Sequence, residues 1–103
     1  MIEATAAVPT YNADRYVLSV CKRWHEGMDV NVRERQGVIH FENAVATFTP
    51  SANQLVVSIL AKDEESIAHL QHVVMAHLET AVLPNEPLTF DWRRSANFEL
   101  HAL

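Results

Sequence analysis

The sequence predicts an α+β fold: a two-layer sandwich in which two helices cover one face of a mainly antiparallel sheet. Its 103 residues are 49% hydrophobic and 20% charged, which is typical of one globular domain. Two segments carry apolar residues at helical spacing, and most others alternate apolar and polar residues as half-buried strands do. Short turns between the strands favour antiparallel neighbours. The predicted order is β-α-β-β-β-β-α-β.

Pro9-Thr10 separates the first strand from the first helix. Apolar and polar residues alternate over residues 2–8, the period of a strand with one buried face. Asn12 is a suitable N-cap for the helix, and Gly27 is a suitable stop. The expected apolar face of this helix comprises Ala13, Val17, Val20, Cys21, Trp24 and Met28.

Four strands follow as a meander. They are expected over residues 30–33, 38–41, 44–49 and 55–60. The turns that join them are predicted at Gln36-Gly37, Glu42-Asn43 and residues 50–53. Apolar residues on both faces of 56–60 suggest that a partner covers the face of the sheet opposite the helices. A homo-oligomer, in the simplest case a homodimer, is therefore expected.

Asp63 is the predicted N-cap of the second helix. The negative charges of Glu64 and Glu65 in its first turn interact favourably with the positive end of the helix dipole. Pro84 and Pro87 end this helix. Its apolar stripe comprises Ile67, Leu70, Val74, Leu78 and Ala81.

The C-terminal segment alternates apolar residues with Thr89, Asp91 and Arg93, which indicates a short strand or an extended apolar strip. We therefore expect a single domain over residues 1–94. Residues 95–103 form a tail that a partner could order.

Composition excludes several function classes. The net charge of −5 and the pI near 5.6 argue against binding to nucleic acid or to an anionic membrane. No leader sequence is visible, and no apolar run approaches the roughly 20 residues of a membrane span. The single Cys21 excludes an internal disulfide and is expected to be a small buried residue. We expect a cytoplasmic protein.

Catalytic motifs are missing from the sequence. It contains no G-x-S-x-G, no glycine-rich phosphate loop and no H-E-x-x-H. At 103 residues the chain is also too short for a (β/α)8 barrel, which needs at least about 200. Whether the protein is an enzyme stays open, because distant segments or two subunits could still assemble a site. No cofactor is specified.

Glu65, His69 and His72 are candidate metal ligands on the second helix. Their spacing of i, i+4 and i+7 places them on one side, nearly opposite the apolar stripe. A carboxylate and two imidazoles can hold a divalent ion when another element completes the site. The alternative is an ordinary solvated helix face.

Lys22, His77 and Trp92 are the candidate ligand-binding residues. His77 lies on the flank of the apolar stripe, where it is either a packed histidine or a group that contacts a ligand. Trp92 follows a strand and precedes two arginines, so it can line a pocket or an interface. A binding module would bring the three together between helix and sheet. The alternatives are a small enzyme with a subunit-shared site and His77 as acid/base, and a homodimeric interaction domain without a ligand.

Several segments in order resemble a bacterial family of small proteins of unknown function, over about residues 4–94. They are Val8-Pro9-Thr10, Tyr16 with Cys21-Lys22-Arg23-Trp24, Gly37 to Phe41, Val73-Val74 with His77-Leu78-Glu79, and Leu88 to Trp92. Relatives in this family occur alone, and some are joined to, or found beside, siderophore-interacting flavin reductases. The resemblance therefore implies an accessory module in siderophore and iron metabolism, with a flavin reductase or another siderophore-pathway protein as partner. The chain departs from the family pattern at Glu26-Gly27-Met28, and at Asn43-Ala44, where a glycine is expected.

Overall fold

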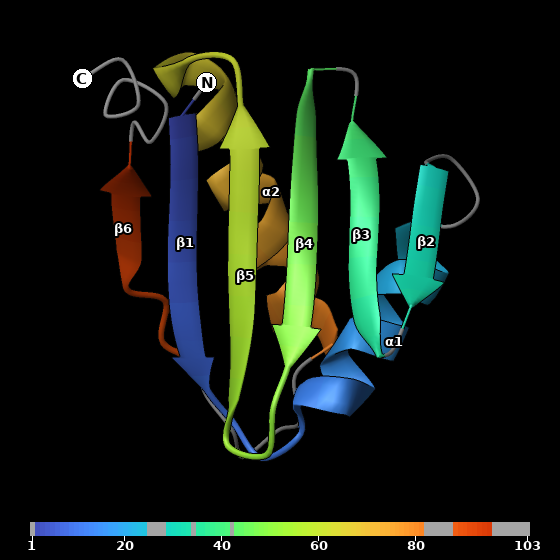
Figure 1. The fold of residues 1–103 in the computed structure, drawn as a ribbon. Coiled ribbons are helices and arrows are strands. Elements are labelled where there is room, and N and C mark those ends of the chain that lie inside the picture. The colour runs from blue at the N-terminus through green and yellow to red at the C-terminus, as the bar shows by residue number, and fades with distance from the viewer. Residues whose placement is uncertain (1, 25–28, 34, 42, 82–87, 96–103) are drawn as a thin grey trace.

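The computed structural model describes residues 2–24, 29–33, 35–41, 43–81 and 88–95. Within them the chain forms the predicted α+β sandwich, and the predicted order of elements is confirmed (Figure 1). The elements are β1 (Ile2–Pro9), α1 (Ala13–Trp24), β2 (Asp29–Arg33), β3 (Gln36–Phe41), β4 (Ala44–Pro50), β5 (Gln54–Ala61), α2 (Glu64–Ala81) and β6 (Trp92–Ser95).

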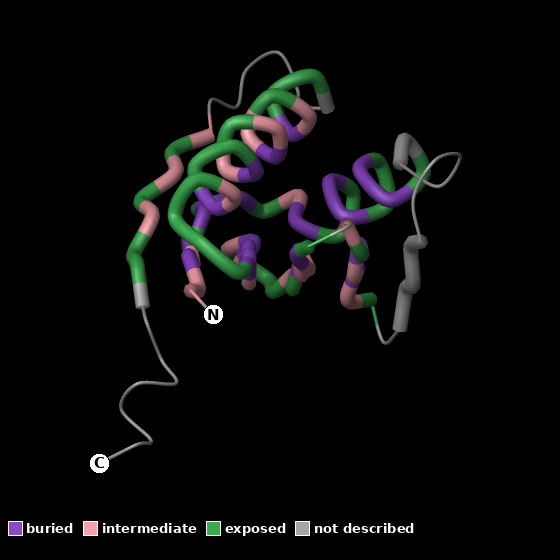
Figure 2. The backbone as a smooth tube through the Cα atoms, turned by 90° about the horizontal axis from the view of Figure 1, so that it is seen from above, coloured by how far each residue is buried: buried purple, intermediate pink, exposed green. Residues whose placement is uncertain are grey.

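The strands form one sheet in the order β2-β3-β4-β5-β1-β6, and every neighbouring pair is antiparallel. β1 therefore lies between β5 and β6. Both helices cover the same face of the sheet, α1 over β2, β3 and β4 and α2 over β5 and β1 (Figures 1 and 2). The opposite face has no layer of its own among the described residues, and it faces the viewer in Figure 1.

Thr10 fixes the junction between β1 and α1. Its backbone N–H donates to the carbonyl of Asn53 at 3.2 Å, and its Oγ1 accepts from the backbone N–H of Asn12 at 3.0 Å. The backbone N–H of Tyr16 donates to the carbonyl of Asn12 at 3.1 Å, which starts the helix. These bonds satisfy backbone groups at a buried corner. They place the start of α1 at Ala13, as predicted.

The turn between β2 and β3 is two residues earlier than predicted. Arg33 pairs with Gln36, and Arg35 takes the left-handed conformation at φ 73°. The prediction assigned Gly37 to this turn and is wrong, because Gly37 is a buried residue of β3. A Cβ at Gly37 would lie 2.5 Å from Cys21 Sγ and 3.1 Å from Val17 Cγ1. The glycine is needed so that α1 can approach the strand closely.

An exposed ion pair connects this turn to α1. Arg35 Nε donates to Asp14 Oδ1 at 2.7 Å, and Arg35 Nη2 donates to the other carboxylate oxygen. The hydrogen bond from Arg35 holds the pKa of Asp14 below its ordinary value. The bidentate pair joins the β2–β3 turn to the first turn of α1.

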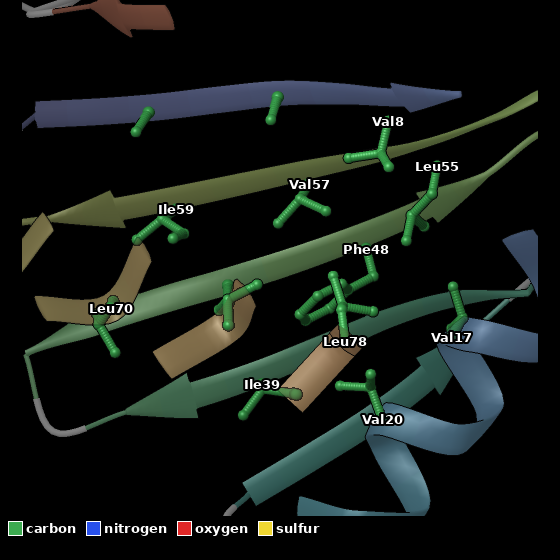
Figure 3. Packing of buried hydrophobic residues seen from close by; sticks show 14 of the residues in the cluster. Val8, Val17, Val20, Ile39, Phe48, Leu55, Val57, Ile59, Leu70 and Leu78 are labelled. Atoms are coloured by element: carbon green, nitrogen blue, oxygen red, sulfur yellow. The ribbon is translucent and has the colours of Figure 1, made fainter. Parts of the chain in front are cut away.

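The core lies between the helices and the sheet (Figure 3). Both predicted helix stripes are buried as far as the structure describes them. The side chains of Trp24 in α1 and Ala81 in α2 are not described, and the predicted stripe member Met28 lies outside the described residues. Tyr16 is also fully buried, which the apolar pattern did not predict. Phe48 projects from β4 into the middle of the core, beside Leu78 of α2.

The predicted burial of Cys21 is confirmed. Burial raises the pKa of its thiol, which disfavours the reactive thiolate. No helix in the described part of the chain has the length and apolar character needed to cross a bilayer.

Asp63 caps α2, as predicted. Its Oδ1 accepts the backbone N–H of Ser66 at 2.8 Å, and its carbonyl accepts the N–H of Ile67 at 3.1 Å. The backbone hydrogen bond to Ser66 is the main reason that the pKa of Asp63 lies below its ordinary value.

This cap predicts a pH-dependent difference between the protein and its Asp63→Asn variant, in which a neutral side chain replaces the charged cap. Because folding lowers the pKa of Asp63, its contribution is present above the unfolded pKa of about 3.9 and is lost as pH falls through the folded value. Urea unfolding should give a higher midpoint for the wild type at pH 7. The difference should shrink below about pH 4. A difference that stays constant with pH would contradict the assignment.

Candidate functional site

A pocket of about 350 Å³ lies between the β3–β4 connection and the N-terminal half of α2. Its lining combines apolar and polar side chains. The apolar members are Phe41, Ala44, Leu70 and Val73, and the polar members are Asn43, Ser66 and His69.

The local sequence explains how these residues meet. Phe41 pairs directly with Ala44, so the chain reverses tightly at the end of the β3–β4 hairpin. On α2, Ser66, Leu70 and Val73 follow one another at helical spacing and therefore lie on one side of the helix. Leu70 is almost completely buried, whereas Phe41 and Val73 are half-buried and keep part of their surface toward the pocket. The pocket is thus an opening at the edge of the core.

A second, more polar depression adjoins the pocket. It shares Asn43, Ser66 and His69 with the first and adds Lys62, Asp63 and Glu65. An apolar interior beside polar groups is the usual composition of a small-molecule site. The combined surface suits a compact ligand that buries an apolar part and leaves a polar end beside His69.

The candidate metal ligands are all exposed on α2. Glu65 and His69 line the polar depression, whereas His72 is not part of its lining. Among the described residues, no three His, Cys, Asp or Glu side chains are grouped closely enough to hold a metal ion. The structure therefore gives His69 a place in a pocket without assembling the predicted set of three ligands.

The candidate ligand-binding residues lie on three different elements. Lys22 is exposed on α1, which covers β2, β3 and β4, whereas Trp92 belongs to β6 at the far edge of the sheet. His77 is half-buried on α2, and its carbonyl accepts a hydrogen bond from Thr80 Oγ1 at 2.8 Å. None of the three lines the pocket beside Phe41. The fold separates Lys22 and Trp92 by most of the sheet (Figure 1).

Trp92 has packing partners at the edge of the core. Its ring stacks on Phe90 with centroids 6.0 Å apart and an interplanar angle of 10°. Its indole Nε1 donates to Met75 Sδ at 3.4 Å, and its backbone position pairs with Ala6 of β1. Nearby, Arg94 of β6 forms an ion pair with Glu64 of α2 at 3.2 Å. These contacts attach β6 to β1 and α2.

His69 is among the predicted candidate ligands, but the pocket around it was not predicted. One feature of the sequence pointed to the pocket: Val73 is an apolar residue of α2 that is not part of the predicted apolar stripe. It follows Leu70 by three positions and is less buried than Val74. Phe41, a large apolar residue at the end of a predicted hairpin, was a second feature that pointed to the pocket. Periodicity could not connect the two, because they are brought together only by the packing of α2 against the sheet.

The fold and this pocket define a small α+β domain with one sheet, one helical layer and an opening at the edge of its core. The chain belongs to a family described as uncharacterized proteins conserved in bacteria, DUF2218, whose profile matches residues 5–93. An NMR structure of PA4090 from Pseudomonas aeruginosa is similar to it. The two share 30% identity with a TM-score of 0.77, and the match covers 90% of this chain and 96% of the other. No curated protein matches the chain.

Proposed function

We propose that this protein is a non-catalytic module that binds a small, partly apolar molecule in the pocket between the β3–β4 hairpin and α2. The observation that supports the proposal is the lining of that pocket, in which Phe41, Leu70 and Val73 form an apolar interior and His69 lies at its polar side. Apolar surface supplies affinity, and a few placed polar groups supply orientation.

The size of the pocket limits the ligand. Its 350 Å³ is near the lower end of the roughly 300–1,000 Å³ typical of ligand sites. At about 30 Å³ for each water molecule, the space corresponds to roughly a dozen waters. A ligand with a single ring and one or two polar substituents fits such a volume, whereas a large cofactor would have to extend over the surface.

The site favours binding over catalysis. His69 supplies the one imidazole in the lining of the pocket. The other titratable side chains nearby, Lys62, Asp63 and Glu65, line the adjoining depression and are exposed to solvent. The alternative in which His77 acts as acid/base has less support, because His77 does not line either depression. A packed position beside the core explains its half-buried state without chemistry.

The resemblance to proteins found beside siderophore-interacting flavin reductases makes the proposal more specific. We infer an accessory role in iron acquisition, in which the pocket holds a ring fragment of the kind found in catecholate and phenolate iron chelators. Asn43 and Ala44 stand where the family is expected to carry glycine, and both line the pocket. The ligand preference of this chain should therefore differ from that of relatives with glycine.

The test is a titration of the ¹⁵N-labelled protein followed by NMR, with 2,3-dihydroxybenzoate and salicylate as the first probes. Iron(III), zinc, FMN and haem form a second set. We expect one of the ring acids to shift the amide signals of Ala44, Ser66 and Val73 before those of Ser51 and Gln54, in the β4–β5 turn at the other end of the sheet. Shifts confined to other regions, or none with any probe, would overturn the proposal.

Val73→Trp should weaken binding of the successful probe at least tenfold, which corresponds to about 1.4 kcal/mol. The larger side chain fills the pocket from a half-buried position, so the fold should tolerate it. Ala76→Trp is the matched control because Ala76 is exposed on the same helix and does not line the pocket. Equal affinities for the two variants would show that the probe binds elsewhere.

A further inference from the structure

The face of the sheet opposite the helices carries no charge at its centre among the residues whose side chains the structure describes. We call this surface the open face; its side chains alternate along each strand with those buried under the helices. Its central residues are Thr5, Ala7, Gln36, Val38, Val45, Thr47, Thr49, Val56, Ser58 and Leu60. Among the residues whose side chains the structure describes, the charged or titratable members of this face lie at its periphery; they are Glu3, His40 and Arg93.

This distribution differs from that of an ordinary solvated sheet face. Most of the central residues are only partly exposed, and four of them are valine or leucine. An uncharged centre with polar groups at the edge is the composition of a protein–protein interface. Figure 1 looks onto this face and shows that neither helix covers it.

We propose that a second copy of this chain covers the open face, and that the two sheets pack face to face about a two-fold axis. The axis runs parallel to the strands between β4 and β5, the middle of the order β2-β3-β4-β5-β1-β6. It places β4 over the partner's β5 and β3 over the partner's β1. Sheets that pack in this way keep their strands nearly aligned.

The strand register then determines which side chains face each other. Val45 and Leu60 are neighbours in one row of the sheet, and Thr47 and Ser58 are neighbours in the next. A two-fold rotation about an axis parallel to the strands does not change the position of a residue along that axis. Each row of one sheet therefore faces the same row of the partner's sheet. Val45 therefore faces the partner's Leu60, and Thr47 faces the partner's Ser58. At these two central positions an apolar residue meets an apolar one and a hydroxyl meets a hydroxyl, whereas Val38 faces the partner's Thr5 and Val56 faces the partner's Thr49. The same surface is used on both copies, as in an isologous interface.

The polar groups at the edge of the open face are complementary under the same rotation, because a carboxylate can accept a hydrogen bond from an imidazole N–H. Glu3 of β1 and His40 of β3 occupy the row that contains Val45 and Leu60. β1 and β3 are equally far from the axis, so Glu3 faces the partner's His40, and the pair occurs twice. Glu3 already accepts a hydrogen bond from Ser58 Oγ at 2.9 Å, which holds its carboxylate on the open face.

The available area is sufficient for a weak to moderate dimer. Strands about 4.8 Å apart with about six residues each, at about 3.4 Å per residue, give a six-stranded face of roughly 580 Å². Two such faces bury roughly 1,200 Å², the lower end of the range for specific interfaces. The dimer should therefore form reversibly at micromolar concentrations.

Sedimentation equilibrium across micromolar concentrations tests the proposal. The wild type should show a monomer–dimer equilibrium, and Thr47→Lys should weaken it at least tenfold because two lysines would be buried at the centre. Ala68→Lys on the exposed side of α2 is the control and should leave the equilibrium unchanged. Circular dichroism verifies that each variant is folded. A wild type that stays monomeric would overturn the proposal.

Charge exchange tests the orientation of the two copies. Glu3→Lys and His40→Glu should each weaken the dimer, whereas the double variant should recover most of the lost affinity, since each pair then joins a lysine to a glutamate of opposite charge. Leu18→Lys probes the alternative interface, because Leu18 is an exposed apolar residue on α1. Dissociation by Leu18→Lys but not by Thr47→Lys would overturn the face-to-face arrangement. The proposal does not depend on the ligand site.

Discussion

Phe48→Ala is expected to lower the free energy of unfolding by about 3–5 kcal/mol. The Phe48 ring is completely buried and lies between β4 and α2, beside Leu78 and Val57 (Figure 3). Its removal loses the transfer free energy of the ring and leaves a cavity that both layers of the sandwich must close. Because small domains have a total stability of about 5–15 kcal/mol, a large fraction of the variant should be unfolded at moderate temperature.

Urea unfolding followed by circular dichroism measures this loss. Tyr11→Ala is the matched control, since Tyr11 is an aromatic residue that is 84% exposed. Its removal should change the stability by no more than about 0.5 kcal/mol. If Phe48→Ala and Tyr11→Ala lowered the free energy of unfolding by similar amounts, the central position of Phe48 in the core would be contradicted.

Gly37→Ala is expected to lower the free energy of unfolding by about 1–3 kcal/mol. The change adds a single methyl group, yet that group would lie 2.5 Å from Cys21 Sγ and 3.1 Å from Val17 Cγ1. Both atoms belong to α1, so the helix would have to move away from β3 or the cysteine side chain would have to rotate. Urea unfolding again provides the measurement.

The double variant Gly37→Ala/Cys21→Ala isolates the contact responsible. Cys21→Ala removes the sulfur that the new methyl group would meet, so the two changes should be strongly non-additive and the double variant more stable than Gly37→Ala alone. Simple addition of the two losses would show that the helix does not pack on Gly37 as described.

Sequence periodicity predicted the elements well because most segments have one buried and one exposed side. The helix stripes ending in Cys21 and Leu78 and the alternation in β5 follow directly from that requirement. Gly37 was misassigned because the sequence does not distinguish a glycine that forms a turn from one that allows close packing. Tyr16 was missed because its hydroxyl group makes it look like a surface residue, although it is fully buried.

The candidate site was less predictable than the fold. His69 was identified through its spacing from Glu65 and His72, which is a local feature of one helix. The pocket also needs Phe41 and Ala44 from a hairpin that precedes the helix in the chain. Such a site depends on the relative placement of two elements, and no local pattern encodes that placement. The separation of Lys22 from Trp92 has the same origin, because the strand order decides it.

The position of β1 affects how the chain folds. The strands β2 to β5 are joined by short connections and can pair soon after they are made, whereas Glu3 pairs with Leu60 and with Ser95. Pairings between residues so far apart in sequence slow folding. During synthesis at about 5–20 residues per second, the first strand must wait several seconds for its last neighbour. β1 is thus made well before its second neighbour, and one of its pairing edges stays exposed until β6 has been synthesised.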